Sequence, residues 1–225
     1  RWDELEFKRL KQALETRLKG NEANPTAIAF NNFSKLIYGD KHIMGIPAIG
    51  TIETVQSISL DDLKAFYHEN LSASMASIHV VGFVDQEQVV RAFDGIDKRW
   101  EAKQVAKPSY ELPENSLAGN LYFIDVPNSK QSTLILGRLA LSASDVDYNN
   151  LDFANEILGG GSAGKLMQIL RIEKGYTYGA YSFLREYREV SPFIAYSRVR
   201  ANATKQSMDI IVDLLENYGS SFSEE

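Results

Sequence analysis

The stretch GGGSAGKLMQILRIEKGYTYGAYS, from Gly159 to Ser182, contains residue types that could bind a phosphate group. Gly159, Gly164 and Lys165 match three fixed positions of a P-loop, in which backbone amides and a lysine cradle nucleotide phosphates. Leu166 stands where that motif needs a hydroxyl to coordinate magnesium. A P-loop also follows a buried strand, whereas the preceding LDFANEIL has a helical period. The pattern therefore favours a glycine connection between two helices over a nucleotide site.

Two further side chains of this stretch, Arg171 and Tyr178, carry hydrogen-bond donors. Taken alone, they have simpler explanations. Arg171 would be a favourable cation at the end of a helix, and Tyr178 an ordinary aromatic residue of a strand. The residues by themselves therefore do not establish a catalytic role.

The histidines do not form a recognisable metal-binding motif. His42, His68 and His79 have no useful spacing, and the chain has no cysteine. His68 and the glutamate after it begin like an H-E-x-x-H zinc motif, but Ser72 stands in place of the second histidine. We therefore predict no metal ligand in this chain.

Composition limits the classes of function. The chain has 225 residues, a net charge of -6 and 44% hydrophobic residues, which predicts a globular protein. The acidic balance argues against a nucleic-acid partner, and no apolar run is long enough for a membrane segment. The absence of cysteine suits a bacterial periplasm and a cytoplasm equally, so the localisation stays unknown. Because the chain starts without Met and stops abruptly, we expect it to be a fragment.

Local patterns predict a mixture of helices and strands. Apolar spacing and capping residues predict helices over 3–20, 24–39, 59–71, 85–92, 147–160, 163–175 and 204–219. Short apolar or β-branched runs predict strands over 74–82, 120–126, 131–141, 176–187 and 192–201, the last two as an antiparallel pair. These elements lack the regular alternation of a parallel sheet, so the fold class is predicted to be α+β.

A proline-containing, charged segment divides the chain. Residues 101–118 are predicted to be a linker. Residues 1–100 would then be the C-terminal part of a first peptidase-like domain, and residues 119–225 a truncated second one. This description as peptidase-like rests on the following resemblance.

The chain resembles the pitrilysin/insulinase family of zinc peptidases, which includes mitochondrial processing peptidase. In that family a glycine-rich connection leads into a helix that ends in an arginine. A Glu-x-Gly stretch follows, and a tyrosine lies seven residues after the arginine. Arg171, Glu173, Gly175 and Tyr178 occupy those places here. Residues 36–85 are also similar to the family's stretch that joins its first domain to its second.

The resemblance implies a fold and a division of labour. The fold would be processing-peptidase-like (LuxS/MPP-like), with antiparallel sheets packed with helices. The family's catalytic half binds zinc with H-x-x-E-H, which this chain lacks. The chain would be the non-catalytic half, in which Arg171 and Tyr178 bind the peptide substrate and its transition state. Gly159, Gly160 and Gly161 would form a substrate loop.

The same resemblance implies partners. Zinc is expected in an H-x-x-E-H-bearing half, in the same or a separate chain, and no cofactor is expected in this one. The first helix is similar to the one that carries the third zinc ligand in active halves, with Thr16 or Arg17 at that place and Glu15 beside it. No ligand is assigned there, since a glutamate on a helix face is ordinarily solvated.

Two alternatives from other classes stay open. Some relatives in respiratory complexes look like peptidases but serve assembly, so the chain could be a scaffold. An H-x-x-E-H motif elsewhere in the protein or in a partner chain would favour the peptidase. A nucleotide-binding module would instead require Lys165 to bind phosphate.

Overall fold

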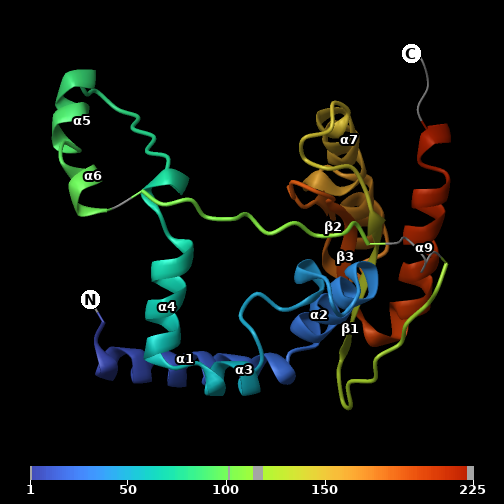
Figure 1. Ribbon diagram of the computed structural model, residues 1–225. Coiled ribbons are helices and arrows are strands. Elements are labelled where there is room, and N and C mark those ends of the chain that lie inside the picture. Colours follow the sequence, from blue (N-terminus) through green and yellow to red (C-terminus); the bar gives the residue numbers. More distant parts are fainter. Residues whose placement is uncertain (1, 101, 114–118, 222–225) are drawn as a thin grey trace. The chain divides into compact units, whose positions relative to one another are not determined.

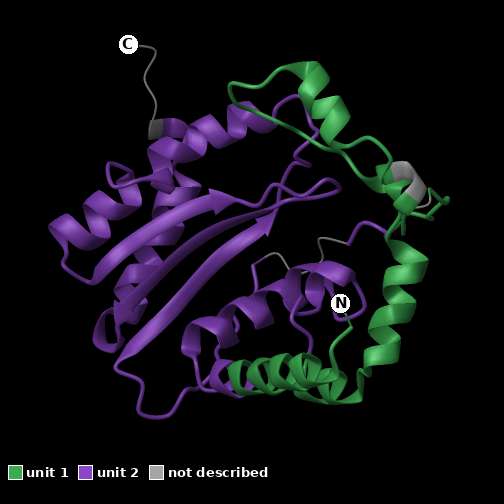
Figure 2. Ribbon diagram, turned by 90° about the vertical axis from the view of Figure 1, so that its left-hand side faces the viewer, with its two compact units in different colours: residues 1–17, 51–109 green, residues 18–50, 110–225 purple. Residues whose placement is uncertain are grey.

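The computed structural model describes residues 2–100, 102–113 and 119–221, in which helices predominate and three strands form a sheet (Figure 1). The chain divides into two compact units (Figure 2). Unit 1 comprises Arg1–Arg17 and Thr51–Ser109, and unit 2 comprises Leu18–Gly50 and Tyr110–Glu225. Each unit has its own internal packing, and the candidate site residues all belong to unit 2.

Unit 1 consists of helices joined by irregular segments. Its helices are most of α1 (Glu4–Glu22), α3 (Ile52–Ser57), α4 (Leu60–Asn70), η2 (Ala73–Met75), α5 (Gln86–Ala92) and α6 (Ile96–Arg99). The Lys11 ammonium of α1 donates to the carbonyls of Gln56 and Ile58 at 2.7 and 2.8 Å, which ties α1 to the end of α3. Ser59 and Asp62 cap each other's backbone amides at the start of α4, so the predicted cap is confirmed.

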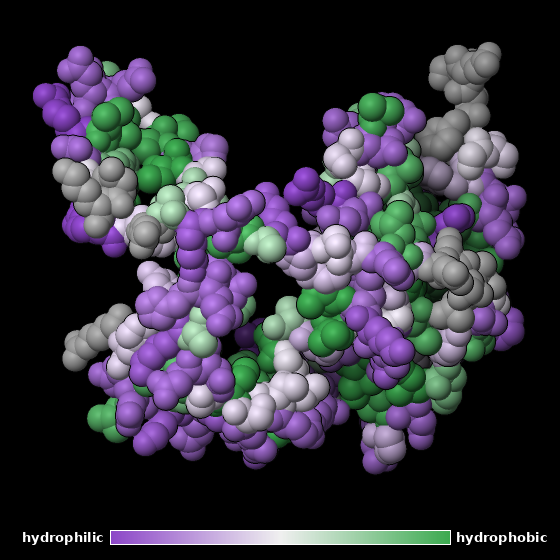
Figure 3. Space-filling view, viewed as in Figure 1, coloured by the Kyte–Doolittle hydropathy of each residue, from purple (hydrophilic) through white to green (hydrophobic). Residues whose placement is uncertain are grey.

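The strand predicted over 74–82 is wrong. Its first residues belong to the short helix η2, and residues 76–84 form neither helix nor strand. A strand needs a neighbour for its backbone hydrogen bonds, and within the described residues none pairs with this segment. Val81 and Phe83 are fully exposed as a result. Hydrophobic side chains gather at the surface around α5 (green in Figure 3).

Unit 2 holds the sheet and the helices that pack on it. Its strands are β1 (Gln131–Leu139), β2 (Thr177–Leu184) and β3 (Pro192–Arg200). Its helical segments are α2 (Pro25–Tyr38), η1 (Ile43–Gly45), α7 (Tyr148–Asn155), η3 (Glu156–Gly160), α8 (Lys165–Met167), η4 (Gln168–Glu173), η5 (Ala201–Ala203), α9 (Thr204–Glu216) and η6 (Gly219–Ser221). Asn24 caps α2 by accepting from the amides of Thr26 and Ala27, as the Asn-Pro pair predicts.

The sheet has the order β1-β3-β2, with both pairs antiparallel. Tyr196 of the central strand β3 lies opposite Ile135 of β1 and Tyr181 of β2. The predicted β2–β3 pair and the strand β1 are confirmed. The strand predicted over 120–126 is wrong, because this segment is irregular and pairs with no strand of the described chain. Its Leu121 and Phe123 side chains are exposed.

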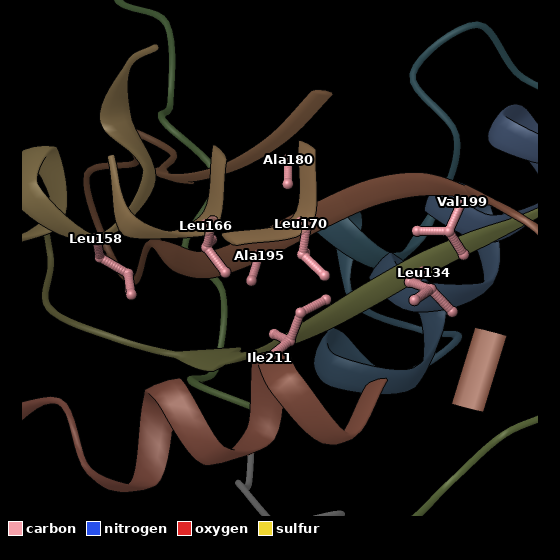
Figure 4. Close-up of a cluster of buried hydrophobic side chains, with 8 residues drawn as sticks. All are labelled: Leu134, Leu158, Leu166, Leu170, Ala180, Ala195, Val199 and Ile211. Carbon is pink, nitrogen blue, oxygen red and sulfur yellow. The ribbon is translucent and has the colours of Figure 1, made fainter. Parts of the chain in front are cut away.

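A hydrophobic core lies between the sheet and the helical segments on one of its faces (Figure 4). It consists of Leu134, Leu158, Leu166, Leu170, Ala180, Ala195, Val199 and Ile211. Ala195 and Val199 of β3 reach this core, while Tyr196 lies on the opposite face of the strand, where its ring packs on Phe30 of α2 at 5.3 Å. The sheet is therefore covered by α2 on one face and by α8, η4 and α9 on the other.

Helices and an antiparallel sheet occur together without a parallel crossover, so the predicted α+β class is confirmed. The domain boundaries expected at residues 100 and 118 stay a prediction. Within the expected linker, residues 102–113 form no helix or strand. Residues 101 and 114–118 lie outside the described residues.

Stability of unit 2 should depend strongly on Leu170. Its side chain has an exposed fraction of 0%, whereas Ile172, two residues later in η4, is 64% exposed. Leu170→Ala leaves a cavity in the core and should lower the free energy of unfolding by about 2–5 kcal/mol. Urea unfolding followed by circular dichroism measures this, with Ile172→Ala as the matched control. Equal effects of the two substitutions would contradict the packing described.

Candidate functional site

The glycine-rich segment begins inside a wide helical turn. Gly160 ends η3, which continues α7, but the backbone is kinked at Gly159, whose φ of -166° and ψ of 18° are not helical, and Gly161 is already extended. A Cβ atom on Gly159 would lie 2.5 Å from the backbone nitrogen of Ser182 and 2.8 Å from a methyl group of Leu166. Gly161 has nothing within 4 Å of that position. Gly159 therefore serves close packing against β2, whereas Gly161 faces open space.

A buried hydrogen bond fastens the same segment to β2. The Asn155 side-chain amide donates to the carbonyl of Ser182 at 3.1 Å. Both side chains are buried, with exposed fractions of 5% and 1%. A hydrogen bond away from water has few competitors, so it fixes the end of α7 on the strand that carries Tyr178. The sequence did not reveal Asn155, because nothing in the pattern around a polar residue at a helix end predicts that its side chain is buried.

Arg171 lies in η4, a second π-helical segment, which continues α8. Leu170 before it is buried in the core, while Arg171 itself is exposed. The expected position near the end of a helix is confirmed. Short π-helical turns inside helices are frequent at functional sites, and nothing in the 3.6-residue periodicity of the sequence predicted this one.

The turn from η4 to β2 is closed by backbone hydrogen bonds. The amide of Gly175 donates to the carbonyl of Arg171 at 3.1 Å, and the amide of Tyr176 donates to that of Leu170 at 2.9 Å. Gly175 has a φ of 61°, a left-handed conformation that glycine adopts without a steric penalty. This cap fixes the path of the chain between Arg171 and the start of β2.

Tyr178 stands at an irregularity of β2. Thr177 pairs with Val199 and Ala180 pairs with Ser197, so Tyr178 and the following glycine lie opposite a single residue of β3. Two residues opposite one is a β-bulge, which often redirects a side chain beside an active site. The Tyr178 side chain is 86% exposed.

Arg171 and Tyr178 are thus both exposed and lie at the two ends of one tightly capped turn. In the described part of the chain, neither side chain makes a hydrogen bond or ion pair with another residue. Their donors are therefore available to a ligand.

The glycines of the segment contact β2 through Gly159, and within the described residues they make no hydrogen bond with the Arg171 or Tyr178 side chain that would join them into one site. The bulge went unpredicted, although a glycine inside a strand pattern, as at Gly179, is a signal for one.

The resemblance to a P-loop does not extend to the structure. A helical segment precedes the glycines, and Leu166 is buried with an exposed fraction of 1%. The Lys165 ammonium lies 5.6 Å from the centre of the Tyr218 ring, and the Tyr218 hydroxyl donates to the carbonyl of Ala154. Burial raises the pKa of Tyr218. Lys165 therefore lies against Tyr218, which follows α9 and hydrogen-bonds to α7, and the glycines do not form a phosphate cradle.

The donor set of the described residues does not fit a zinc site. Among the described residues, no three or more His, Asp or Glu side chains gather closely enough to hold a metal ion. The Nδ1 atom of His42 accepts from the amide of Met44, and its ring stacks on Tyr38 at 5.3 Å. His68 packs edge-on against Tyr67. The contacts of His42 and His68 are thus with neighbouring residues of the chain, as expected of histidines that support the fold.

In the part of the chain that the structure describes, every helix is too short or too polar to cross a bilayer.

Residues 57–225 match the family model described as the peptidase M16 inactive domain. The chain belongs to this family. The match covers the glycine-rich segment, Arg171 and Tyr178, and it confirms the resemblance to the zinc-peptidase family that the sequence suggested. Family membership does not by itself assign a role to either side chain.

Zinc proteases and an M16 inactive domain are among the similar proteins. The chain is 26% identical to the uncharacterized zinc protease YmxG of Bacillus subtilis over 95% of its length, and 27% identical to an uncharacterized zinc protease of Streptomyces coelicolor over 87%. These matches cover 51% and 43% of the two relatives, so the chain spans about half of their length.

A solved structure confirms the fold. The crystal structure of the peptidase M16 inactive domain from Pseudomonas fluorescens is 25% identical, with a TM-score of 0.86. The match covers 97% of this chain and 52% of the other. The expected processing-peptidase-like α+β fold is therefore confirmed.

The contact between Gly159 and β2 gives a prediction for stability. Gly159→Ala places a methyl group against the backbone of Ser182 and should lower the free energy of unfolding by about 1–3 kcal/mol or more. Gly161→Ala meets nothing within 4 Å and should change it by less than about 0.5 kcal/mol. Thermal or urea unfolding of both variants measures the difference. An unchanged Gly159→Ala protein would show that the strand and the glycine are not in contact.

Metal content gives a second prediction. Because the donors of the described chain do not cluster, the purified chain should hold no stoichiometric zinc after dialysis against zinc-free buffer. Elemental analysis measures this directly. About one tightly bound zinc per chain would contradict the prediction, since a protein zinc site needs three or four close ligands.

Proposed function

We propose that this chain is the non-catalytic, substrate-binding half of a zinc metallopeptidase, in which Arg171 and Tyr178 contact the peptide. The observation that carries the proposal is their arrangement. Two unpaired hydrogen-bond donors are exposed at the ends of one capped turn, each on a packed support. The alternative, a peptidase-like scaffold without a proteolytic role, does not require these side chains to be free.

The chemistry of peptide cleavage suits these two donors. Attack on the scissile peptide places negative charge on the carbonyl oxygen, and donors already in place stabilise that charge. The Arg171 guanidinium offers several N–H groups and a permanent positive charge, while the Tyr178 phenol offers one O–H group. Held in a fixed geometry, they would also orient the peptide backbone before reaction.

The remaining catalytic groups would come from a companion half that carries H-x-x-E-H, either fused to this chain or separate. Zinc bound there would activate the attacking water. The names of the relatives, zinc proteases about twice as long as the matched region, support a companion of this kind. Nothing in the donor set of the described residues could replace it.

Two exposed hydrophobic segments also support a companion. Val81 and Phe83 in unit 1, and Leu121 and Phe123 in unit 2, leave large apolar side chains in water. Both segments have the composition of strands and pair with none in the described chain. Exposed apolar clusters commonly mark protein contacts. We propose that strands of the companion half cover these segments.

Activity should depend on both donors. Tyr178→Phe removes one hydroxyl and keeps the ring, so the chain should fold normally while kcat falls by about ten- to a thousand-fold, as for loss of one oxyanion donor. Arg171→Ala should cost at least as much, because a charge-assisted hydrogen bond is lost. The measurement is hydrolysis of a quenched fluorescent peptide library by this chain together with its H-x-x-E-H half.

Matched controls lie in β2 and just after the end of η4. Tyr181→Phe removes a hydroxyl from the same strand, and Lys174→Ala removes an exposed cation three residues after Arg171. Both should leave kcat and KM nearly unchanged. Full activity of Tyr178→Phe and Arg171→Ala would overturn the assigned roles. A wild-type pair that cleaves no member of the library would favour the scaffold.

Backbone protection should report the companion contacts. Amides of residues 76–84 and 120–126 should exchange rapidly with deuterium in this chain alone, since neither segment is paired. Addition of the companion half should slow their exchange by at least about tenfold if strands form there. Amides in β3, already paired on both sides, serve as the internal reference. Unchanged exchange in both segments would contradict the proposed contact.

A further inference from the structure

The β-bulge that carries Tyr178 is held by a side chain rather than by regular strand pairing. Between the pairs Thr177–Val199 and Ala180–Ser197, Tyr178 and Gly179 face Arg198 alone. The extra residue of a bulge interrupts the ladder of backbone hydrogen bonds. The conformation of Tyr178 therefore depends on whatever satisfies the backbone groups around it.

The Thr177 hydroxyl performs that task. It accepts a hydrogen bond from the amide of Gly179 at 3.0 Å, and it lies 2.6 Å from the carbonyl of Arg198 and 2.9 Å from that of Gly179. A hydroxyl has a single proton. The Arg198 carbonyl is the nearer of the two acceptors, and the Ser197 hydroxyl already donates to the Gly179 carbonyl at 2.9 Å, so we assign the Thr177 proton to Arg198. One oxygen thus links the bulge to β3.

Both flanks of the bulge are fixed as well. On the N-terminal side, the amide of Arg200 donates to the carbonyl of Tyr176 at 3.0 Å, and the Arg200 guanidinium lies over the Tyr176 ring. On the C-terminal side, the Tyr181 ring lies so close to Gly179 that an added Cβ would be 2.8 Å from it. Both flanks of the bulge are therefore anchored. Its conformation then depends on the hydrogen bonds at its centre.

We propose that Thr177 is a positioning residue, whose hydroxyl locks the bulge and thereby orients the Tyr178 phenol toward substrate. The inference rests on the proposed function of Tyr178. Thr177 does not itself touch the peptide. Its effect passes through Tyr178, because misplacing a catalytic donor by about 1 Å is enough to slow a reaction by as much as a hundredfold.

Thr177→Val tests this, since valine keeps the shape of threonine and removes the hydroxyl. Together with the H-x-x-E-H half and the quenched fluorescent peptide library, this variant should show a kcat lowered by about tenfold or more, with a smaller change in KM. Thr177→Ser keeps the hydroxyl and should restore most of the rate. If Thr177→Val does not fold, Ser197→Ala, which removes the other side-chain bond to the bulge, should give the same pattern.

Combining substitutions distinguishes positioning from general destabilisation. In a Tyr178→Phe background, Thr177→Val should lower kcat by less than about twofold, because the hydroxyl it positions is already gone. An equal loss in both backgrounds would overturn the inference. So would full activity of Thr177→Val in an enzyme that Tyr178→Phe impairs. If Tyr178→Phe itself has no effect, the proposed function fails first, and the two failures are thereby distinguished.

Discussion

The contact between Gly159 and the backbone of Ser182 is the constraint on which the rest of unit 2 depends. It leaves no room for a side chain, so the helical segment and β2 approach as closely as two backbones can. Asn155 reinforces the contact with a buried hydrogen bond to Ser182. Leu166 and Leu170 then fill the core behind it. The candidate donors lie on the neighbouring elements, since β2, which this contact positions, carries Tyr178, and η4, which packs on β2, carries Arg171.

Glycines in this stretch illustrate why a motif needs its structural context. A P-loop uses glycine so that backbone amides can approach a phosphate. Here Gly159 allows approach to a neighbouring strand, and Lys165 lies over an aromatic ring of the C-terminal region. The glycines and the lysine are of the same types in both cases. The element before the glycines distinguishes this segment from a P-loop, and the sequence already indicated that this element is helical.

Features set by neighbouring residues were predictable from the sequence, and those set by distant pairing were not. The cap of α4 by Ser59 depends on residues within one turn, and it was predicted correctly. The segments around Val81 and Leu121 have strand-like composition, but composition does not supply a partner strand. Arg171 and Tyr178 were found through a family resemblance. The bulge at Tyr178 depends on the register of β2 against β3, and Gly179 is a local signal of a bulge but does not set that register.

The place of β2 at the edge of the three-stranded sheet gives the bulge a second consequence. An edge strand leaves backbone groups free to pair with another chain, and bulges are one way in which proteins prevent this. The irregularity at Tyr178 and Gly179 interrupts the exposed edge where the candidate phenol projects. One distortion thus both limits unwanted pairing and redirects a side chain that regular alternation would point to one face of the sheet. Positioning by Thr177 therefore costs the sheet little, because an uninterrupted edge would itself be a liability.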